Sequence, residues 1–353
     1  MRNRRRQRSR ALDSNDRGAR PERTSSILQR GDDPIDPARD HPATFAEVLA
    51  PHDWLILAYF ALLFLGVLFG SGPDRLRAGV LVLEHAVVLV VGLALTRGGI
   101  LGRATFASAL LYRLTLFGTV ASSYGALRVV LPAAAPRVVD STLYAIDLRV
   151  FHVEPALAWD RFVTPWTTEW FAFFYFGYFF ILASYILPFM LLAQNMAMLA
   201  RFATATFFTF CCGHLLYIVV PGFGPHWFLA TSFKHELPGG LFWGLVNATI
   251  DSAGAEKDIF PSLHTAVPAM FTLLAFRFRR ECRAFRASWL LTGLCTTQII
   301  IATMFLRWHY LIDICAGLAL AVLAVWVSDR AVLWDDARRK RLDLPAAWTP
   351  LFG

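Results

Sequence analysis

The stretch IFPSLHTAVPAM, residues Ile259–Met270, lies where a polar loop gives way to an apolar run. A proline, a serine and a histidine stand together at the start of what the pattern predicts is a membrane-spanning helix. An ionisable side chain is costly at that place unless it has a partner or a function. The number of similar apolar runs predicts the fold, and the polar residues at their ends predict the chemistry.

Long apolar blocks dominate the composition of this chain. Its 353 residues are 56% hydrophobic and only 17% charged, whereas a soluble domain of this size would carry more charge. We therefore expect an all-α fold, a polytopic helical membrane bundle of about eight spans, each near the ~20 residues that a bilayer requires. The expected spans are residues 54–71, 78–96, 106–131, 169–193, 198–220, 260–277, 287–306 and 309–328.

Basic residues flank these spans and give the chain a net charge of +8. They are concentrated in three segments, which are MRNRRRQRSR at 1–10, RFRRECRAFR at 277–286 and RRKR at 338–341. Nucleic-acid binding is one interpretation of such clusters. An alternating arrangement of eight spans places all three segments on one side, however, so the positive-inside rule is the better explanation. We expect a multi-pass cell-membrane protein with both termini cytoplasmic and with no nucleic-acid partner.

Two histidines fall at the same predicted membrane surface. His264 begins the sixth span, and His309 begins the eighth in RWHYLIDICAG. Asp313 follows His309 by four residues, so we expect the two to share one helix face. An imidazole can attack phosphorus, a carboxylate can fix its tautomer, and a second histidine can exchange protons with the leaving and entering oxygens. Ser262 and the backbone N–H groups at the helix start could hold phosphate oxygens.

At these residues the sequence resembles the type 2 phosphatidic acid phosphatase superfamily, and within it the inositol phosphorylceramide synthase branch. The segments that carry the resemblance are FPSLHTA (260–266), HYLIDICAG (309–317) and YIVVPGFGPHW (217–227). The resemblance covers about residues 107–328. It implies a six-helix catalytic core, with His309 as the nucleophile, Asp313 as its orienting group and His264 as the general acid and base. It implies no metal, and we expect no cofactor.

Composition, the expected spans and the resemblance together divide the chain into four parts. These are a disordered basic tail (1–50), two additional spans (51–105), the catalytic membrane domain (106–328) and a basic tail (329–353). The active site would then lie on the non-cytoplasmic face, between the long loops 132–168 and 221–259.

The sequence departs from the superfamily pattern at three places. Leu263 stands where the superfamily often has glycine, Ala302 and Thr303 replace a Ser-Arg pair, and the Lys- and Arg-containing first signature is missing. The phosphate-binding cations are therefore open, with Arg307 and Lys257 as substitutes. Pro225 and His226 lie in the first-signature turn, and the role of His226 stays open.

Three functions remain at this point. The first is transfer of a phosphoryl-bearing head group from a phospholipid to a second lipid's hydroxyl, with a ceramide-like or diacylglycerol-like acceptor implied by resemblance only. The second is hydrolysis of a lipid phosphate or polyprenyl diphosphate by the same residues. The third is a transporter or scaffold without catalysis. Among other polar groups, His214 could line the pocket, and Asp147 is an interfacial or capping residue. The aromatic run 171–180 is expected to pack against lipid and neighbouring spans, and its second interpretation is the lining of an acyl-chain groove.

Overall fold

The computed structural model describes residues 43–102, 105–253 and 256–352, and within these ranges the chain is helical and contains no strand. Most of the tail that we expected to be disordered lies outside the described residues. In chain order the helices are α1 (Phe45–Val48), α2 (Pro51–Phe69), α3 (Arg75–Arg97), α4 (Phe106–Ala134), α5 (Asp140–Val150), α6 (Pro155–Trp159), η1 (Asp160–Phe162), α7 (Pro165–Leu192), α8 (Met196–Val219), α9 (Pro225–Phe228), η2 (Ala230–Ser232), α10 (Leu241–Ala253), α11 (Leu263–Phe278), α12 (Phe285–Phe305) and α13 (Leu311–Arg341).

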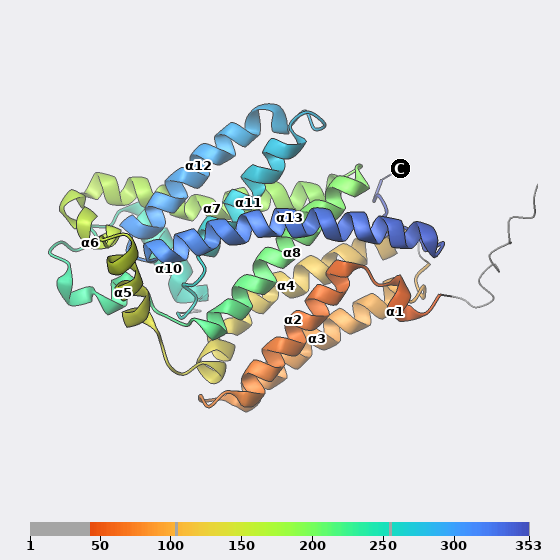
Figure 1. Ribbon diagram of the computed structural model, residues 1–353, viewed down its shortest axis with the longest axis horizontal. Coiled ribbons are helices and arrows are strands. Elements are labelled where there is room, and N and C mark those ends of the chain that lie inside the picture. Colours follow the sequence, from red (N-terminus) through yellow and green to blue (C-terminus); the bar gives the residue numbers. More distant parts are fainter. Residues whose placement is uncertain (1–42, 103–104, 254–255, 353) are drawn as a thin grey trace, which may run out of the picture. The chain divides into compact units, whose positions relative to one another are not determined.

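Seven of these helices are long and apolar enough to cross a membrane, namely α2, α3, α4, α7, α8, α12 and α13. This confirms the predicted polytopic helical bundle. The predicted sixth span is α11, an apolar helix of only 16 residues, which corresponds to about 24 Å. It packs against α7, α8, α12 and α13, so most of its surface contacts protein and it need not match the bilayer thickness (Figure 1).

The helix starts follow from local sequence signals. Proline is the first residue of α2 and α7, where its missing N–H has no intrahelical acceptor. The Thr164 hydroxyl caps α7, and the Asn195 side chain accepts the Met198 N–H at 3.0 Å at the start of α8. These signals place the helix starts within a few residues of those predicted from hydropathy.

The eighth span differs most from its predicted limits. The helix α13 begins at Leu311 rather than at 309, and it continues to Arg341 rather than ending near 328. Its basic end is ordered because Arg338 and Arg339 pair with Asp335 and donate to the backbone carbonyls of Leu49 and Val48. A boundary at residue 328 therefore falls inside a helix.

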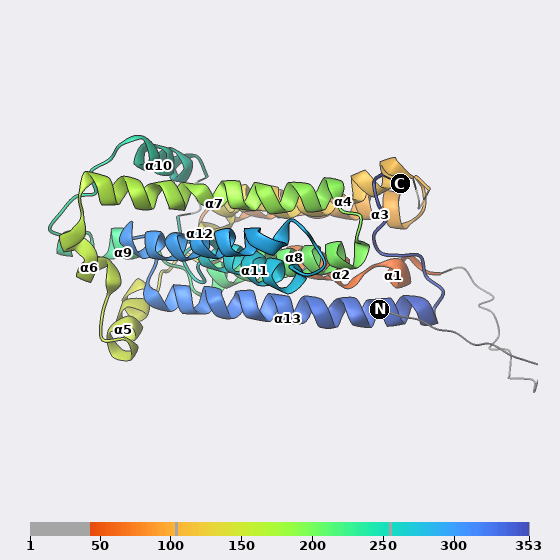
Figure 2. The same ribbon diagram turned by 90° about the horizontal axis from the view of Figure 1, so that it is seen from above.

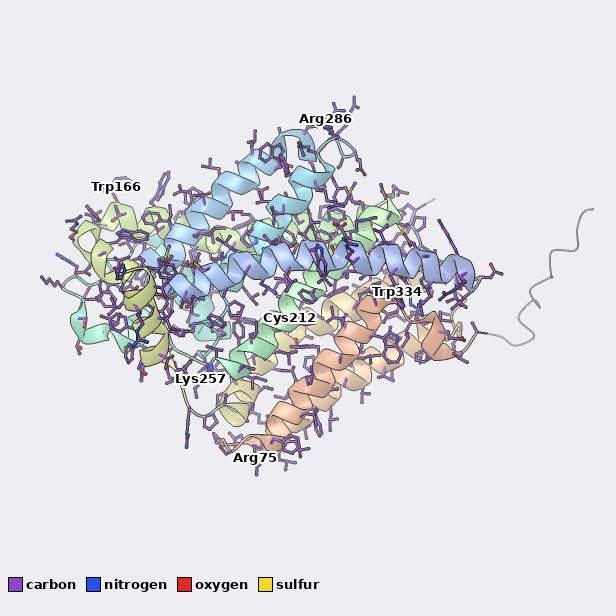
Figure 3. The ribbon with its side chains drawn as sticks, in the orientation of Figure 1. Arg75, Trp166, Cys212, Lys257, Arg286 and Trp334 are labelled. Atoms are coloured by element: carbon purple, nitrogen blue, oxygen red, sulfur yellow. The ribbon has the colours of Figure 1, made fainter. Side chains whose placement is uncertain are left out.

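The two long predicted loops form short helices at one end of the bundle. Helices α5, α6, α9 and α10 gather there, and α1 and the end of α13 lie at the opposite end (Figure 2). Exposed tryptophans mark both ends, with Trp166 at the first and Trp334 near the second (Figure 3). Arg286 lies in the first turn of α12, next to the segment that joins it to α11 (Figure 3).

Two carboxylates of α5 hold the start of α13 in place. Asp147 is fully buried, and its oxygens accept the N–H groups of Leu311 and Ile312 at 2.6 and 2.9 Å. Asp140 accepts the Tyr310 hydroxyl at 3.1 Å, and it also accepts the Gly224 N–H. Asp147 is therefore a capping residue, as one of the two sequence interpretations held, although it caps a distant helix rather than its own.

The start of α11 lies directly against α13. The Ser262 N–H donates to the backbone oxygen of Asp313 at 3.1 Å. A Cβ atom added at Gly317 would lie 2.6 Å from the Ser262 carbonyl oxygen, so only glycine permits this approach. The two helices that carry the predicted catalytic residues are thus joined at their N-terminal ends.

Gly317→Ala should separate this junction. The new methyl group meets a backbone oxygen that cannot rotate away, so we expect about 1–3 kcal/mol of overpacking strain and loss of most turnover. Gly118→Ala is the matched control, because a Cβ at that α4 glycine meets nothing within 4 Å. Thermal unfolding in detergent measures the effect. An equal apparent melting temperature for the two variants would contradict the close approach.

Candidate active site

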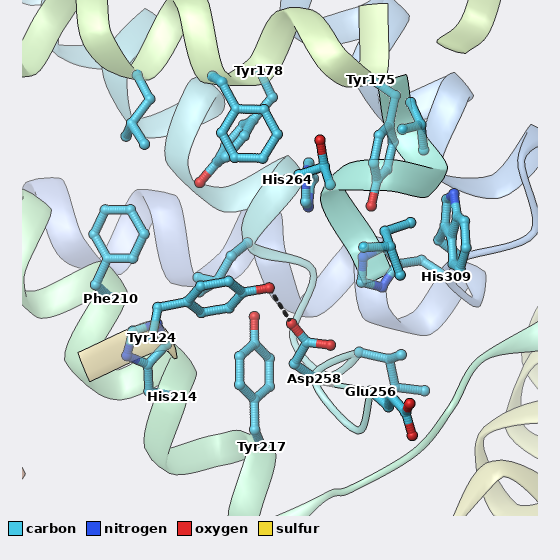
Figure 4. A pocket seen from close by; sticks show the side chains of 18 of the residues that line it. Tyr124, Tyr175, Tyr178, Phe210, His214, Tyr217, Glu256, Asp258, His264 and His309 are labelled. Atoms are coloured by element: carbon cyan, nitrogen blue, oxygen red, sulfur yellow. Dashed lines mark hydrogen bonds between the residues drawn. The ribbon is translucent and has the colours of Figure 1, made fainter. Parts of the chain in front are cut away.

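One cavity of about 790 Å³ opens beside the start of α11. Residues from α4, α7, α8, α9, α10 and the segment before α11 line it, together with His264 and His309 (Figure 4). The rings of these two histidines have centroids 6.5 Å apart. That separation is too long for a direct contact between the rings, and it leaves space for a tetrahedral group between them.

His309 lies in the turn between α12 and α13, two residues before the helix begins. The expectation that His309 and Asp313 share one helix face is therefore corrected, because Tyr310 is the N-cap of α13. The Nδ1 atom of His309 nevertheless lies 3.4 Å from Oδ2 of Asp313, and both side chains are buried. Oδ2 also accepts the Tyr310 N–H at 2.9 Å, which fixes the carboxylate at the helix start. Since Nδ1 faces Asp313, Nε2 is the nitrogen that remains for a substrate.

His264 lies on the first turn of α11, between aromatic rings of α7. Its ring stacks on Tyr175 at a centroid distance of 4.3 Å and contacts Tyr178 at the same distance. Its Nε2 atom is buried and has no hydrogen-bond partner among the described residues. The aromatic walls therefore fix the ring plane and leave one nitrogen for a ligand.

Asp258 is a lining residue that the sequence interpretation missed. Its carboxylate accepts the Tyr124 hydroxyl at 2.7 Å, and its backbone forms an isolated bridge with Gly222. Burial raises the pKa of Asp258 to about 6, although the Tyr124 hydroxyl and His309 act to lower it. Asp258 lies six residues before His264 in a loop, where no helical spacing signals a role.

The electrostatic environment keeps His309 neutral. Burial lowers its pKa to about 4, and the neighbouring Asp258 carboxylate only partly offsets this effect. At neutral pH the ring therefore has a free lone pair, which nucleophilic attack requires. Burial likewise lowers the pKa of His226, which also lines the cavity, to about 4.

The two predicted phosphate-binding cations are held elsewhere. Arg307 pairs with Asp160 at 2.9 Å and stacks over Phe233, and the Lys257 ammonium donates to the carbonyls of Ala135 and Pro136. Among the described lining residues there is no arginine or lysine. Imidazoles and the start of α11 are the groups of this cavity that could meet an anion.

The other predicted site residues have backbone roles. Ser262 is fully buried, and it is not among the lining residues, although its N–H ties α11 to α13. Pro225 is the first residue of α9 and is also absent from the lining. His226 does line the cavity, because its N–H bonds to the Arg307 carbonyl and its ring lies 4.5 Å from that of Trp308.

Beyond the histidines the cavity becomes apolar. Its walls in this part come from α4, α7 and α8, and they include Phe117, Val120, Phe176, Phe179, Leu182, Ile186, Phe207 and Phe210. Part of the aromatic run 171–180 thus lines the cavity, as one of its two interpretations held. A lipid chain fits such a surface, because it gains the hydrophobic free energy without leaving polar groups unpaired.

The fold and the cavity define a polytopic membrane protein with two histidines and a carboxylate at one end of an apolar cavity. A family model described as the PAP2 superfamily matches residues 141–327, just over half of the chain. The chain therefore belongs to the PAP2 superfamily, whose membership supports phosphatase-type or phosphotransferase-type chemistry on lipids. No curated protein and no solved structure matches it.

The pH dependence of the nucleophilic step tests the state of His309. With a phosphodiester donor, which does not titrate in this range, protonation of His309 should not slow the step between pH 8 and pH 5. The fall on the acid side should come only as pH approaches about 4, because His309 then gains a proton. The rate of protein labelling in a single turnover measures this. In Asp258→Asn the fall should stay near the same pH, because Asp258, with a pKa of about 6, is already mostly protonated there. A fall centred near 6.5 would contradict the buried, neutral imidazole.

Proposed function

We propose that this protein transfers a phosphoryl-bearing head group between lipids through a phosphohistidine at His309. The observation that carries the proposal is a single cavity in which His309 and His264 face each other across the width of a tetrahedral group, with an apolar compartment directly behind them. Membership of the PAP2 superfamily supports phosphatase-type or phosphotransferase-type chemistry on lipids. The roles of the individual residues and the transfer to a second lipid are the parts that we propose.

The reaction has two displacements at one phosphorus atom. Nε2 of His309 attacks the phosphorus of the donor lipid, and the bond from phosphorus to the alkoxide oxygen breaks. His264, which enters this step protonated, gives that oxygen a proton and becomes neutral. The hydroxyl of the acceptor lipid then attacks the phosphohistidine, His264 takes the hydroxyl proton, and the P–N bond breaks. Asp313 lies behind Nδ1 and stabilises the positive charge that the ring acquires in the first step.

An acceptor lipid is favoured over water by the apolar compartment. A hydrolase also binds a lipid donor, but it needs no room for a second apolar substrate. The cavity of about 790 Å³ is larger than a head group alone requires, so part of a lipid chain can enter it. An inositol phosphate head group and a ceramide-like acceptor rest on the resemblance of the three signature segments alone.

The membrane orientation is part of the proposal. The basic end of α13 and helix α1 lie at the end of the bundle opposite the cavity (Figure 2). If that end is cytoplasmic, as the positive-inside rule favours, both substrates approach from the non-cytoplasmic leaflet.

A donor lipid labelled on phosphorus tests the function. Wild-type protein should acquire label that is stable to alkali and lost in acid, and His309→Ala should acquire none. Asp313→Asn should label about 10²–10⁴ times more slowly, because the tautomer and the charge of the ring are no longer supported. His152→Asn is the control, since this exposed histidine lies outside the cavity lining.

The fate of the label separates the candidates. Label that moves from the protein to a second lipid supports transfer, and release as a water-soluble phosphate supports hydrolysis. Full labelling of His309→Ala would refute the nucleophile.

A further inference from the structure

His214 is a buried histidine of α8 that the proposed chemistry does not use. It is 1% exposed, it lines the cavity, and its Nε2 atom has no hydrogen-bond partner in the described part of the chain. Figure 4 places it beside Tyr124, away from His264 and His309. It lies five residues before the end of α8, which is about 7 Å along the helix axis. An unpaired polar atom at this depth is costly unless a ligand pairs with it.

The hydrogen bonds behind His214 fix the position of its proton. The Ser123 hydroxyl has one proton, which it donates to the Val120 carbonyl at 2.7 Å. The Tyr59 hydroxyl must therefore be the donor in its 2.9 Å bond with Ser123. Tyr59 has then used its only proton, so in its 3.0 Å bond with His214 the Nδ1–H of the imidazole donates.

The consequence is that Nε2 of His214 carries a lone pair. The ring is neutral, because it is buried and no carboxylate contacts it among the described ion pairs. A neutral imidazole with its proton on Nδ1 can only accept a hydrogen bond at Nε2. This face of the cavity therefore requires a donor from its ligand.

A second acceptor lies on the same wall. The rings of Tyr124 and His214 have centroids 5.8 Å apart, and the Tyr124 hydroxyl donates its hydrogen bond to Asp258. The carboxylate of Asp258 and the lone pair of His214 thus stand at the two ends of one tyrosine side chain. Asp258 and His309 line the same cavity, and Figure 4 shows Asp258 between His309 and His214, so this wall starts at the reacting centre and runs inward.

We propose that this wall is the subsite for the acceptor lipid, and that His214 Nε2 accepts a hydrogen bond from a second O–H or N–H group of that lipid. The reacting hydroxyl lies near Asp258 and His309, and the second donor lies a few bonds deeper, at His214. The subsite selects a neutral lipid alcohol with an amide N–H or a second hydroxyl over one with only ester linkages. The assignment of this lipid as acceptor rests on the proposed function.

A matched pair of probe lipids tests the subsite directly. N-(2-hydroxyethyl)hexadecanamide and 2-hydroxyethyl hexadecanoate differ only in whether an N–H group or an oxygen joins the acyl chain to the hydroxyethyl group. Equilibrium binding of tritiated probes to protein in nanodiscs needs no donor lipid. Wild type should bind the amide about fivefold more tightly, as one additional hydrogen bond predicts. Equal affinities would overturn the proposal.

Variants show which residue causes the preference for the amide probe over the ester probe. His214→Phe keeps a ring of similar size and should bind both probes with equal affinity. Thr206→Val is the matched control, since Thr206 is also a buried lining residue with an unpaired hydroxyl, but lies about 12 Å deeper along α8. It should keep the amide preference. A preference that survives in His214→Phe would contradict the role of this imidazole.

Ser123→Ala provides a second test that does not alter the cavity lining. Without Ser123 the Tyr59 hydroxyl is free to donate to Nδ1, which moves the imidazole proton to Nε2. The amide preference should then fall to about one, and ¹⁵N spectra of histidine-labelled protein should show the change of tautomer, with His214→Phe identifying the signal. An unchanged tautomer and an unchanged preference would refute the proton assignment.

The two proposals fail separately. Labelling of wild-type protein from the phosphodiester donor tests the nucleophile without the subsite, because the donor half-reaction does not use it. Absence of label in wild type would refute the proposed function and leave the binding preference as it was measured. Normal labelling with equal probe affinities would refute the subsite alone.

Discussion

The contact between the starts of α11 and α13 is the constraint on which the site depends. Two helices separated in the chain by all of α12 meet through one backbone hydrogen bond, from Ser262 to Asp313, and through the missing side chain of Gly317. This contact sets the distance between His264 and His309. The α5 carboxylates Asp140 and Asp147 hold the same junction from outside the bundle. The long segment before α7 therefore has a structural reason to be helical.

Burial, rather than a cluster of cations, governs the chemistry of the cavity. No arginine or lysine appears among the described lining residues, and Arg307 and Lys257 are engaged by Asp160 and by backbone carbonyls. A neutral His309 suits a nucleophile, and burial keeps it neutral without a neighbouring cation. Imidazoles and the helix start provide weaker anion binding than arginine. A phosphodiester, with its single negative charge, fits this environment better than a doubly charged phosphate monoester does.

The sequence predicted the bundle because hydropathy and helix-start signals are local. It also predicted that His264 and His309 would approach one another, since both begin spans on the same expected face. It did not predict that His309 precedes its helix, because Tyr310 takes the N-cap position through a hydrogen bond to Asp313. The sequence could not predict the role of Asp258 or the proton position on His214, because both depend on residues more than 60 positions away. Asp258 is bonded to Tyr124, and the proton of His214 is fixed by Tyr59 and Ser123.

The most direct test of the central claim is a structure of the protein with orthovanadate, which adopts the geometry of a phosphoryl group under attack. The account predicts vanadium bonded to Nε2 of His309, with one oxygen within hydrogen-bond distance of His264 and with Asp313 drawn closer to Nδ1. The same experiment on His309→Ala should leave the cavity without vanadate. Vanadate bound at Arg307, or bound equally well without His309, would contradict the claim that phosphoryl transfer passes through this histidine.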